Sequence, residues 1–76
     1  MIWIERYLVY DADGYYRSGW ETQQQATAAA RQIAEATGSA DVKQILIGDH
    51  GSTIRTSRFH RGGRIEKLWR EFEEVS

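Results

Sequence analysis

The chain has 76 residues, no cysteine, no proline, 41% hydrophobic residues and a net charge of −1. This length accommodates a single domain, residues 1–76, with a small core. The absence of cysteine excludes a disulfide framework and a zinc site with Cys ligands, and we expect no cofactor and no metal. The N-terminal stretch "MIWIERYLVY" is too short and too charged for a membrane span or a signal-peptide core, so we expect a cytoplasmic protein without membrane contact.

Charge is distributed unevenly along the chain. Residues 1–50 carry four basic and seven acidic side chains, whereas residues 51–70 carry six basic side chains and Glu66 alone as an acid. Three glutamates follow near the C-terminus. A basic run of this kind is typical either of a solvated face or of a contact patch.

The first predicted elements are a hairpin and a helix. "IWIERYLVY" has the β-branched and aromatic content of a strand, "DADG" predicts a turn with a positive φ at Gly14, and "YYRSGWE" returns as the second strand. Thr22 and Gln25 form a capping box, which predicts a helix over Gln23–Thr37. Gly38 is the expected C-terminal stop.

One face of this helix consists mainly of small residues at i, i+3, i+4 spacing: Ala26, Ala29, Ala30, Ile33, Ala34 and Thr37. An alanine face lets the helix approach its sheet closely, so bulky side chains on the sheet must fill the space. If Tyr10 pairs with Tyr15, alternation supplies them on one face of the hairpin: Trp3, Tyr7, Val9, Tyr16 and Trp20.

A second hairpin and a last helix complete the prediction. "VKQILIG" and "TIRTSRF" pair around "DHGS". Pairing Gly48 with Thr53 separates two apolar sets, Ile45, Ile47 and Ile54 on one face and Val42, Leu46 and Phe59 on the other. "RIEKLWREFEEV" then predicts a short amphipathic helix with Ile65, Leu68, Trp69, Phe72 and Val75 on one face. The expected class is α+β, a small antiparallel sheet in ββαββα order with the alanine-faced helix on one face.

Both predicted hairpins are apolar on both sides, and a sheet with two apolar faces needs two covers. Two alternatives follow. Either the last helix folds back on the second face, or that face or that helix docks on a partner or on a second copy of the chain.

The sequence carries no catalytic constellation. His50 and His60 lie at opposite ends of the second hairpin, on the order of 15 Å or more apart at about 3.3 Å per residue, so they cannot form a dyad. Asp11 and Asp13 are explained as turn formers. We therefore predict that the protein is not an enzyme and has no catalytic residues.

The expected function is that of a non-catalytic binding module that acts through protein–protein contacts, with nucleic-acid binding and homo-oligomerisation through the sheet as alternatives. A protein partner would contact the basic end of the second hairpin and the last helix: Arg55, Arg58, His60, Arg61, Arg64, Trp69, Arg70 and Phe72. A nucleic acid would be bound by Arg55, Arg58, Arg61 and Arg64, with aromatic residues of the sheet available for stacking.

Three resemblances add to this interpretation. Asp13 with Gly14, Thr22, the helix residues Ala26, Ala29, Ala30, Arg31, Ile33 and Ala34, and "ILIG" with Gly51 and Ile54 resemble a family of short bacterial proteins of unknown function built as hairpin, helix, hairpin. "DADGYYRSGWETQQQATAAA" is similar to the N-terminal arm-binding domain of phage-type tyrosine integrases, which implies DNA read by the sheet. The general layout is similar to small phage anti-CRISPR proteins, which implies an inhibitor or regulator carried by a phage or mobile element.

Overall fold

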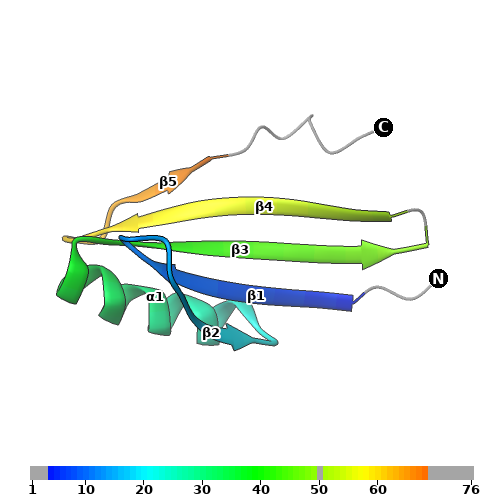
Figure 1. The fold of residues 1–76 in the computed structure, drawn as a ribbon, viewed down its shortest axis with the longest axis horizontal. Coiled ribbons are helices and arrows are strands. Elements are labelled where there is room, and N and C mark those ends of the chain that lie inside the picture. The colour runs from blue at the N-terminus through cyan, green and yellow to red at the C-terminus, as the bar shows by residue number, and fades with distance from the viewer. Residues whose placement is uncertain (1–3, 50, 69–76) are drawn as a thin grey trace.

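A computed structural model describes residues 4–49 and 51–68 of the protein. Over these residues the chain forms β1 (Ile4–Asp11), β2 (Tyr16–Trp20), α1 (Gln23–Thr37), β3 (Ser39–Gly48), β4 (Gly51–His60) and β5 (Ile65–Lys67) (Figure 1). The strands make one antiparallel sheet in the order β2-β1-β3-β4-β5. The predicted α+β class is confirmed.

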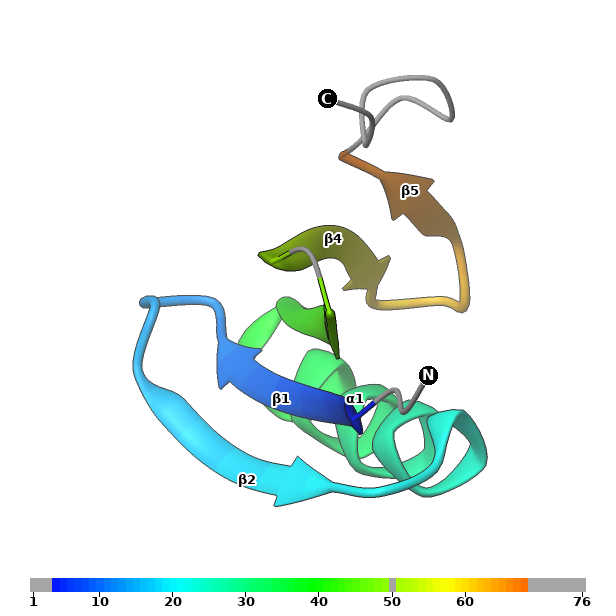
Figure 2. The ribbon, with the colours of Figure 1, turned by 90° about the vertical axis from the view of Figure 1, so that its right-hand side faces the viewer.

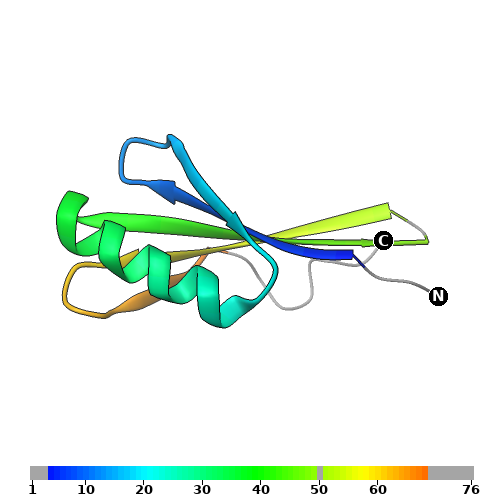
Figure 3. The same ribbon diagram turned by 90° about the horizontal axis from the view of Figure 1, so that it is seen from below.

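The helix has the predicted bounds because its ends are capped as expected. The Thr22 hydroxyl oxygen accepts a hydrogen bond from the Gln25 N–H at 3.2 Å and lies 3.0 Å from the Gln25 side-chain oxygen. Gly38, with φ of 104°, donates its N–H to the carbonyl of Ala34. Figures 2 and 3 show α1 on one side of the sheet only.

The core lies between the alanine face of α1 and the sheet. Ala26, Ala30 and Ala34 are buried. They face a set of buried sheet residues, Tyr7, Val9, Ala40, Val42 and Phe59, with Trp20, Ala29 and Ile33 packed at its margin. The short alanine side chains let the helix lie close to the sheet, and the larger sheet residues fill the interface as predicted.

The first hairpin differs from the predicted register. Tyr7 pairs with Trp20 and Val9 with Ser18, but Tyr10 pairs with Tyr16 across a β-bulge. The Asp11 N–H donates to the Tyr15 carbonyl at 3.0 Å, and the Asp11 carboxylate accepts hydrogen bonds from the N–H groups of Asp13 and Tyr15, both at 3.0 Å, so Asp11 and Tyr15 close the turn. A bulge inserts one residue and turns the following side chains to the other face. The placement of Tyr16 on the helix face was therefore wrong, and Trp3 lies outside the described residues.

The second hairpin has a tighter turn than expected but the predicted faces. Gly48 pairs with Gly51, not with Thr53, and Ile45 pairs with Ile54. A register difference of two residues leaves each side chain on its face, because strand side chains alternate with a period of two. Val42 and Phe59 accordingly face α1 and are buried, while Ile54 lies on the opposite face.

The start of the predicted C-terminal helix is a strand. Ile65 pairs with Phe59, Glu66 with Arg58 and Lys67 with Ser57. Gly62 and Gly63, with φ of 93° and 101°, reverse the chain after β4, and His60 donates its N–H to the Arg64 carbonyl at 2.8 Å. Ile65–Lys67 thus pairs with the edge of β4, and the prediction of a helix was wrong for these residues. The rest of the predicted helix, including Trp69, Arg70 and Phe72, lies outside the described residues.

Candidate binding groove

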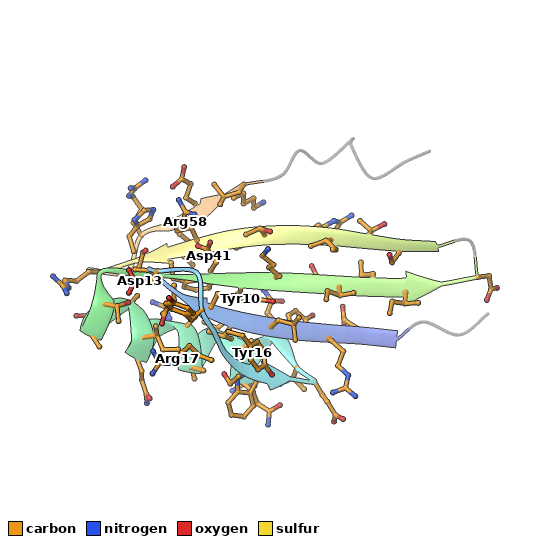
Figure 4. The ribbon with its side chains drawn as sticks, viewed as in Figure 1. Tyr10, Asp13, Tyr16, Arg17, Asp41 and Arg58 are labelled. Atoms are coloured by element: carbon orange, nitrogen blue, oxygen red, sulfur yellow. The ribbon has the colours of Figure 1, made fainter. Side chains whose placement is uncertain are left out.

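The structure separates the arginines that the sequence predicted as one contact patch. Arg55 and Arg58 are three residues apart in β4, so they point to opposite faces of the sheet. Arg55 lies on the side of α1. Arg58 lies on the other face, where Nε and Nη2 bind the two carboxylate oxygens of Asp41 at 2.8 and 3.1 Å (Figure 4). This pairing with Asp41 raises the pKa of Arg58.

Arg61 has a structural role at the end of the helix. Its Nε donates to the backbone carbonyl of Glu35 at 3.2 Å, and its own N–H donates to the carbonyl of Gly38 at 3.0 Å. The neighbouring Gly62 N–H donates to the Glu35 carboxylate at 3.1 Å. A cation at the C-terminal end of a helix satisfies free carbonyls and complements the helix dipole. The turn 61–64 is therefore a joint between α1 and the sheet, with Arg64 exposed at its end.

His60 joins β4 to β5. Its Nε2 lies 2.9 Å from the carboxylate of Glu66, on the face away from α1. This hydrogen bond lowers the pKa of Glu66, and the nearby positive charges of Arg64 and Arg58 act in the same direction. His60, one of the predicted contact residues, thus links β4 to the edge strand β5 through its side chain.

The face away from α1 has an aromatic cluster. Tyr10 and Tyr16 form an edge-to-face pair with ring centroids 5.8 Å apart (Figure 4), and Lys43 Nζ lies 5.1 Å from the Tyr10 centroid. Ile54 is 58% and Tyr16 57% exposed. Within residues 4–49 and 51–68 no helix covers this face. On it, Arg58 is paired with Asp41, and Glu66 is hydrogen-bonded to His60.

The helix side of the sheet contains a groove beside the N-terminal half of α1. Its volume is about 410 Å³, within the range of roughly 300–1,000 Å³ that is usual for ligand sites. The lining comprises apolar or aromatic residues (Tyr7, Val42, Phe59 and Ile65), neutral polar residues (Gln23, Thr27, Gln44 and Ser57) and two charged residues, Arg55 and Lys67. Four strands and the helix therefore contribute to one site.

Among the described residues of the groove lining, the charged side chains, Arg55 and Lys67, are basic. The first turn of α1, which borders the groove, has no acidic side chain. The nearby Glu5 carboxylate accepts a hydrogen bond from the Gln44 amide at 2.9 Å. Burial, and secondarily Glu5, raise the pKa of Tyr7, so its phenol stays protonated. The groove thus combines an apolar floor with basic side chains at its border.

Only part of this groove was predicted from the sequence. Arg55 was predicted as a contact residue, but in a cluster with Arg58, and Lys67 was predicted to lie on a helix. The alternation in "TIRTSRF" does put Arg55 and Ser57 on the face of Phe59, which was a usable signal. No comparable signal indicated Lys67, because its position depends on the capture of β5 by β4.

Comparisons with models of protein families, with curated proteins and with solved structures found no match. In the described part of the chain, no helix has the length and apolar character needed to cross a membrane.

Proposed function

We propose that the protein is a non-catalytic binding module that holds a segment of a partner protein in the groove beside α1. The supporting observation is the lining of the groove, in which an apolar floor is bordered by charges of one sign, Arg55 and Lys67, in a chain whose net charge is −1. Complementary charge gives a contact its specificity and orientation. An inhibitor or regulator would act in this way, by occupying a partner's surface.

The scaffold supports the same proposal. The groove floor is formed by strands that are hydrogen-bonded to their neighbours, and α1 is held by caps at both ends. Binding to a preformed site costs little ordering of the protein. A nucleic-acid interface built on Arg55, Arg58, Arg61 and Arg64 has less support, because these residues lie on different surfaces and two of them bind Asp41 and α1.

A matched pair of cysteines tests this proposal, since the chain has no cysteine of its own. Ser57 and Thr56 are neighbours in β4 and are both partly buried, but Ser57 lines the groove and Thr56 faces away from it. A photoreactive maleimide on Ser57→Cys should capture the partner in a lysate, and the same label on Thr56→Cys should not. Capture at Ser57 should fall when Arg55 and Lys67 are both changed to glutamine.

Two results would contradict the proposal. Capture from Thr56→Cys alone would assign the contact to the opposite face of the sheet. Capture from Ser57→Cys that is unchanged by the double glutamine substitution would show that the basic side chains do not select the partner. Circular dichroism of each labelled variant checks that the fold is retained.

A further inference from the structure

Over residues 4–49 and 51–68, the sheet has room for a second helix on the side of α1. Neighbouring strands are about 4.8 Å apart, so the line between β4 and β5 lies two strand spacings, about 10 Å, from the line between β1 and β3. α1 packs chiefly on β1 and β3. Packed helices have axes 8–10 Å apart, on the order of that same distance. The groove therefore occupies the position that a second helix would take beside α1.

The backbone of the floor excludes an added strand there. β3 is paired with β1 and β4, and β4 is paired with β3 and, at Ser57–Phe59, with β5. The N–H and C=O groups of a strand point within the plane of the sheet, toward its neighbours, so an extended peptide lying over the face of these strands gains no main-chain hydrogen bonds from them. A ligand must bind through side chains, which is how an amphipathic helix docks on an apolar groove.

The groove changes from apolar to basic along the strands. Phe59 and Ile65 are cross-strand partners at one end, Ser57 and Lys67 are partners two residues further on, and Arg55 lies two residues beyond Ser57. Two residues of a strand span about 6.7 Å, and one turn of a helix rises about 5.4 Å. Successive turns of a helix lying along the strands would thus meet the apolar pair first and the basic residues next.

We infer that the segment bound in the groove is an amphipathic α-helix of the partner, lying beside α1. Its aliphatic side chains pack on Val42, Phe59 and Ile65, and its Glu or Asp carboxylates, one to two turns away, bind Lys67 and Arg55. The inference rests on the proposed function and adds the conformation and the charge of the partner segment.

Selection of displayed peptides on the full-length protein tests this inference. One library has random 15-residue peptides free to form helices, and a second has proline fixed at two central positions, which prevents a continuous helix. Enriched peptides are then measured by fluorescence anisotropy against the wild type, Arg55→Gln/Lys67→Gln and a control with the same charge change on the other face, Arg6→Gln/Lys43→Gln.

The expected result is enrichment from the first library of peptides with apolar residues at i, i+3, i+4 and i+7 and acidic residues one to two turns away. Their affinity should fall at least about tenfold with Arg55→Gln/Lys67→Gln, since a hydrogen bond to a charged group contributes roughly 1.5–3 kcal/mol, and less than about twofold with the control. The charge-reversed variant Arg55→Glu/Lys67→Glu should bind peptides whose acids are replaced by lysine, which also shows that the variant is folded.

Other outcomes separate this inference from the proposed function. Groove-dependent binders from the proline library would overturn the helix and leave the binding module standing. No enrichment, or binders indifferent to Arg55 and Lys67, would overturn both. A gain of about tenfold in peptide affinity when Glu71, Glu73 and Glu74 are changed to glutamine would identify the chain's own C-terminal segment as the occupant and overturn the partner helix.

Discussion

Arg58 binds Asp41 through two hydrogen bonds, of 2.8 and 3.1 Å, across β4 and β3 on the face of the sheet away from α1. The two residues are cross-strand partners, so the sheet itself aligns the guanidinium with the carboxylate. The charge that made Arg58 a candidate contact residue is thereby used within the fold. Its side chain is still 41% exposed, so solvent screens the pair.

Changing Arg58 to alanine should lower the free energy of unfolding by about 0.5–1 kcal/mol, because the pair is partly exposed and Asp41 loses its partner. Urea unfolding at low salt measures the change, and 0.5 M NaCl should reduce it. Arg64→Ala, at an exposed position of the following turn, is the control and should change stability little. Equal losses for the two variants would show that the ion pair contributes nothing specific.

The nucleic-acid alternative makes a separate prediction. Arg58 and Arg61 are held by Asp41 and Glu35, so we expect the wild type to bind nucleic acid only weakly. Changing Arg58, Arg61 and Arg64 together to alanine should therefore lower the stability of the fold and leave the weak nucleic-acid binding nearly unchanged. Anisotropy with fluorescent duplex DNA, single-stranded DNA and structured RNA across a salt series measures this. Micromolar binding of the wild type to duplex DNA, with a log–log salt slope near −0.9 per phosphate contact that the triple change reduces, would establish the nucleic-acid function instead.

Because α1 lies close to the sheet, we expect larger side chains to destabilise the fold at its buried alanines but not at its exposed ones. Ala30 is fully buried, so Ala30→Leu should overpack the core and cost about 1–3 kcal/mol. In a domain of this size, 1 kcal/mol corresponds to roughly 4–8 °C in Tm. Ala28 is exposed on the same helix, and Ala28→Leu should shift the Tm by far less. Similar shifts for both would mean that the helix does not pack through its alanine face.

The contact between His60 and Glu66 predicts a loss of β5 pairing in acid. The hydrogen bond from His60, with Arg64 and Arg58 nearby, lowers the pKa of Glu66 below its ordinary value of 4.5. A carboxylate with a lowered pKa in the folded state stabilises the fold above its unfolded pKa, and this contribution is lost as the pH falls through the folded pKa. Amide exchange of Ile65–Lys67 should therefore accelerate, relative to β3, as the pH falls below about 4.5.

The variant Glu66→Gln supplies the control for that measurement. It keeps the size of the side chain but cannot ionise, so the acid-dependent part of the exchange at Ile65–Lys67 should disappear. The pKa of Asp11 is also lowered, mainly by the Tyr15 N–H and further by Arg17 and Asp13. Protonation of Asp11 in acid therefore also destabilises the fold, but in the first hairpin. An acid-dependent opening of β5 that persists in Glu66→Gln would contradict the role of the His60 contact.

Residues close together in sequence determined much of this fold. Thr22, Gln25 and Gly38 set the ends of α1 through hydrogen bonds within a few residues, and the alanine spacing identified the face that packs on the sheet. The faces of the second hairpin could also be predicted, because a strand alternates side chains with a period of two even when the turn is shorter than expected.

The tertiary structure decided the features that depend on distant partners. Ile65–Lys67 became a strand because the edge of β4 offered hydrogen bonds that helical spacing alone does not reveal. The bulge that turns Tyr16 away from α1 lies instead beside a local turn, in which the Asp11 carboxylate accepts hydrogen bonds from residues two and four positions ahead, and the predicted register missed it. The basic run of the sequence was divided by strand alternation, which is local, and by the pairing of β5, which is not. Alternation sent Arg55 and Arg58 to opposite faces, and only the pairing of β5 with β4 brought Lys67 to Arg55 at the groove.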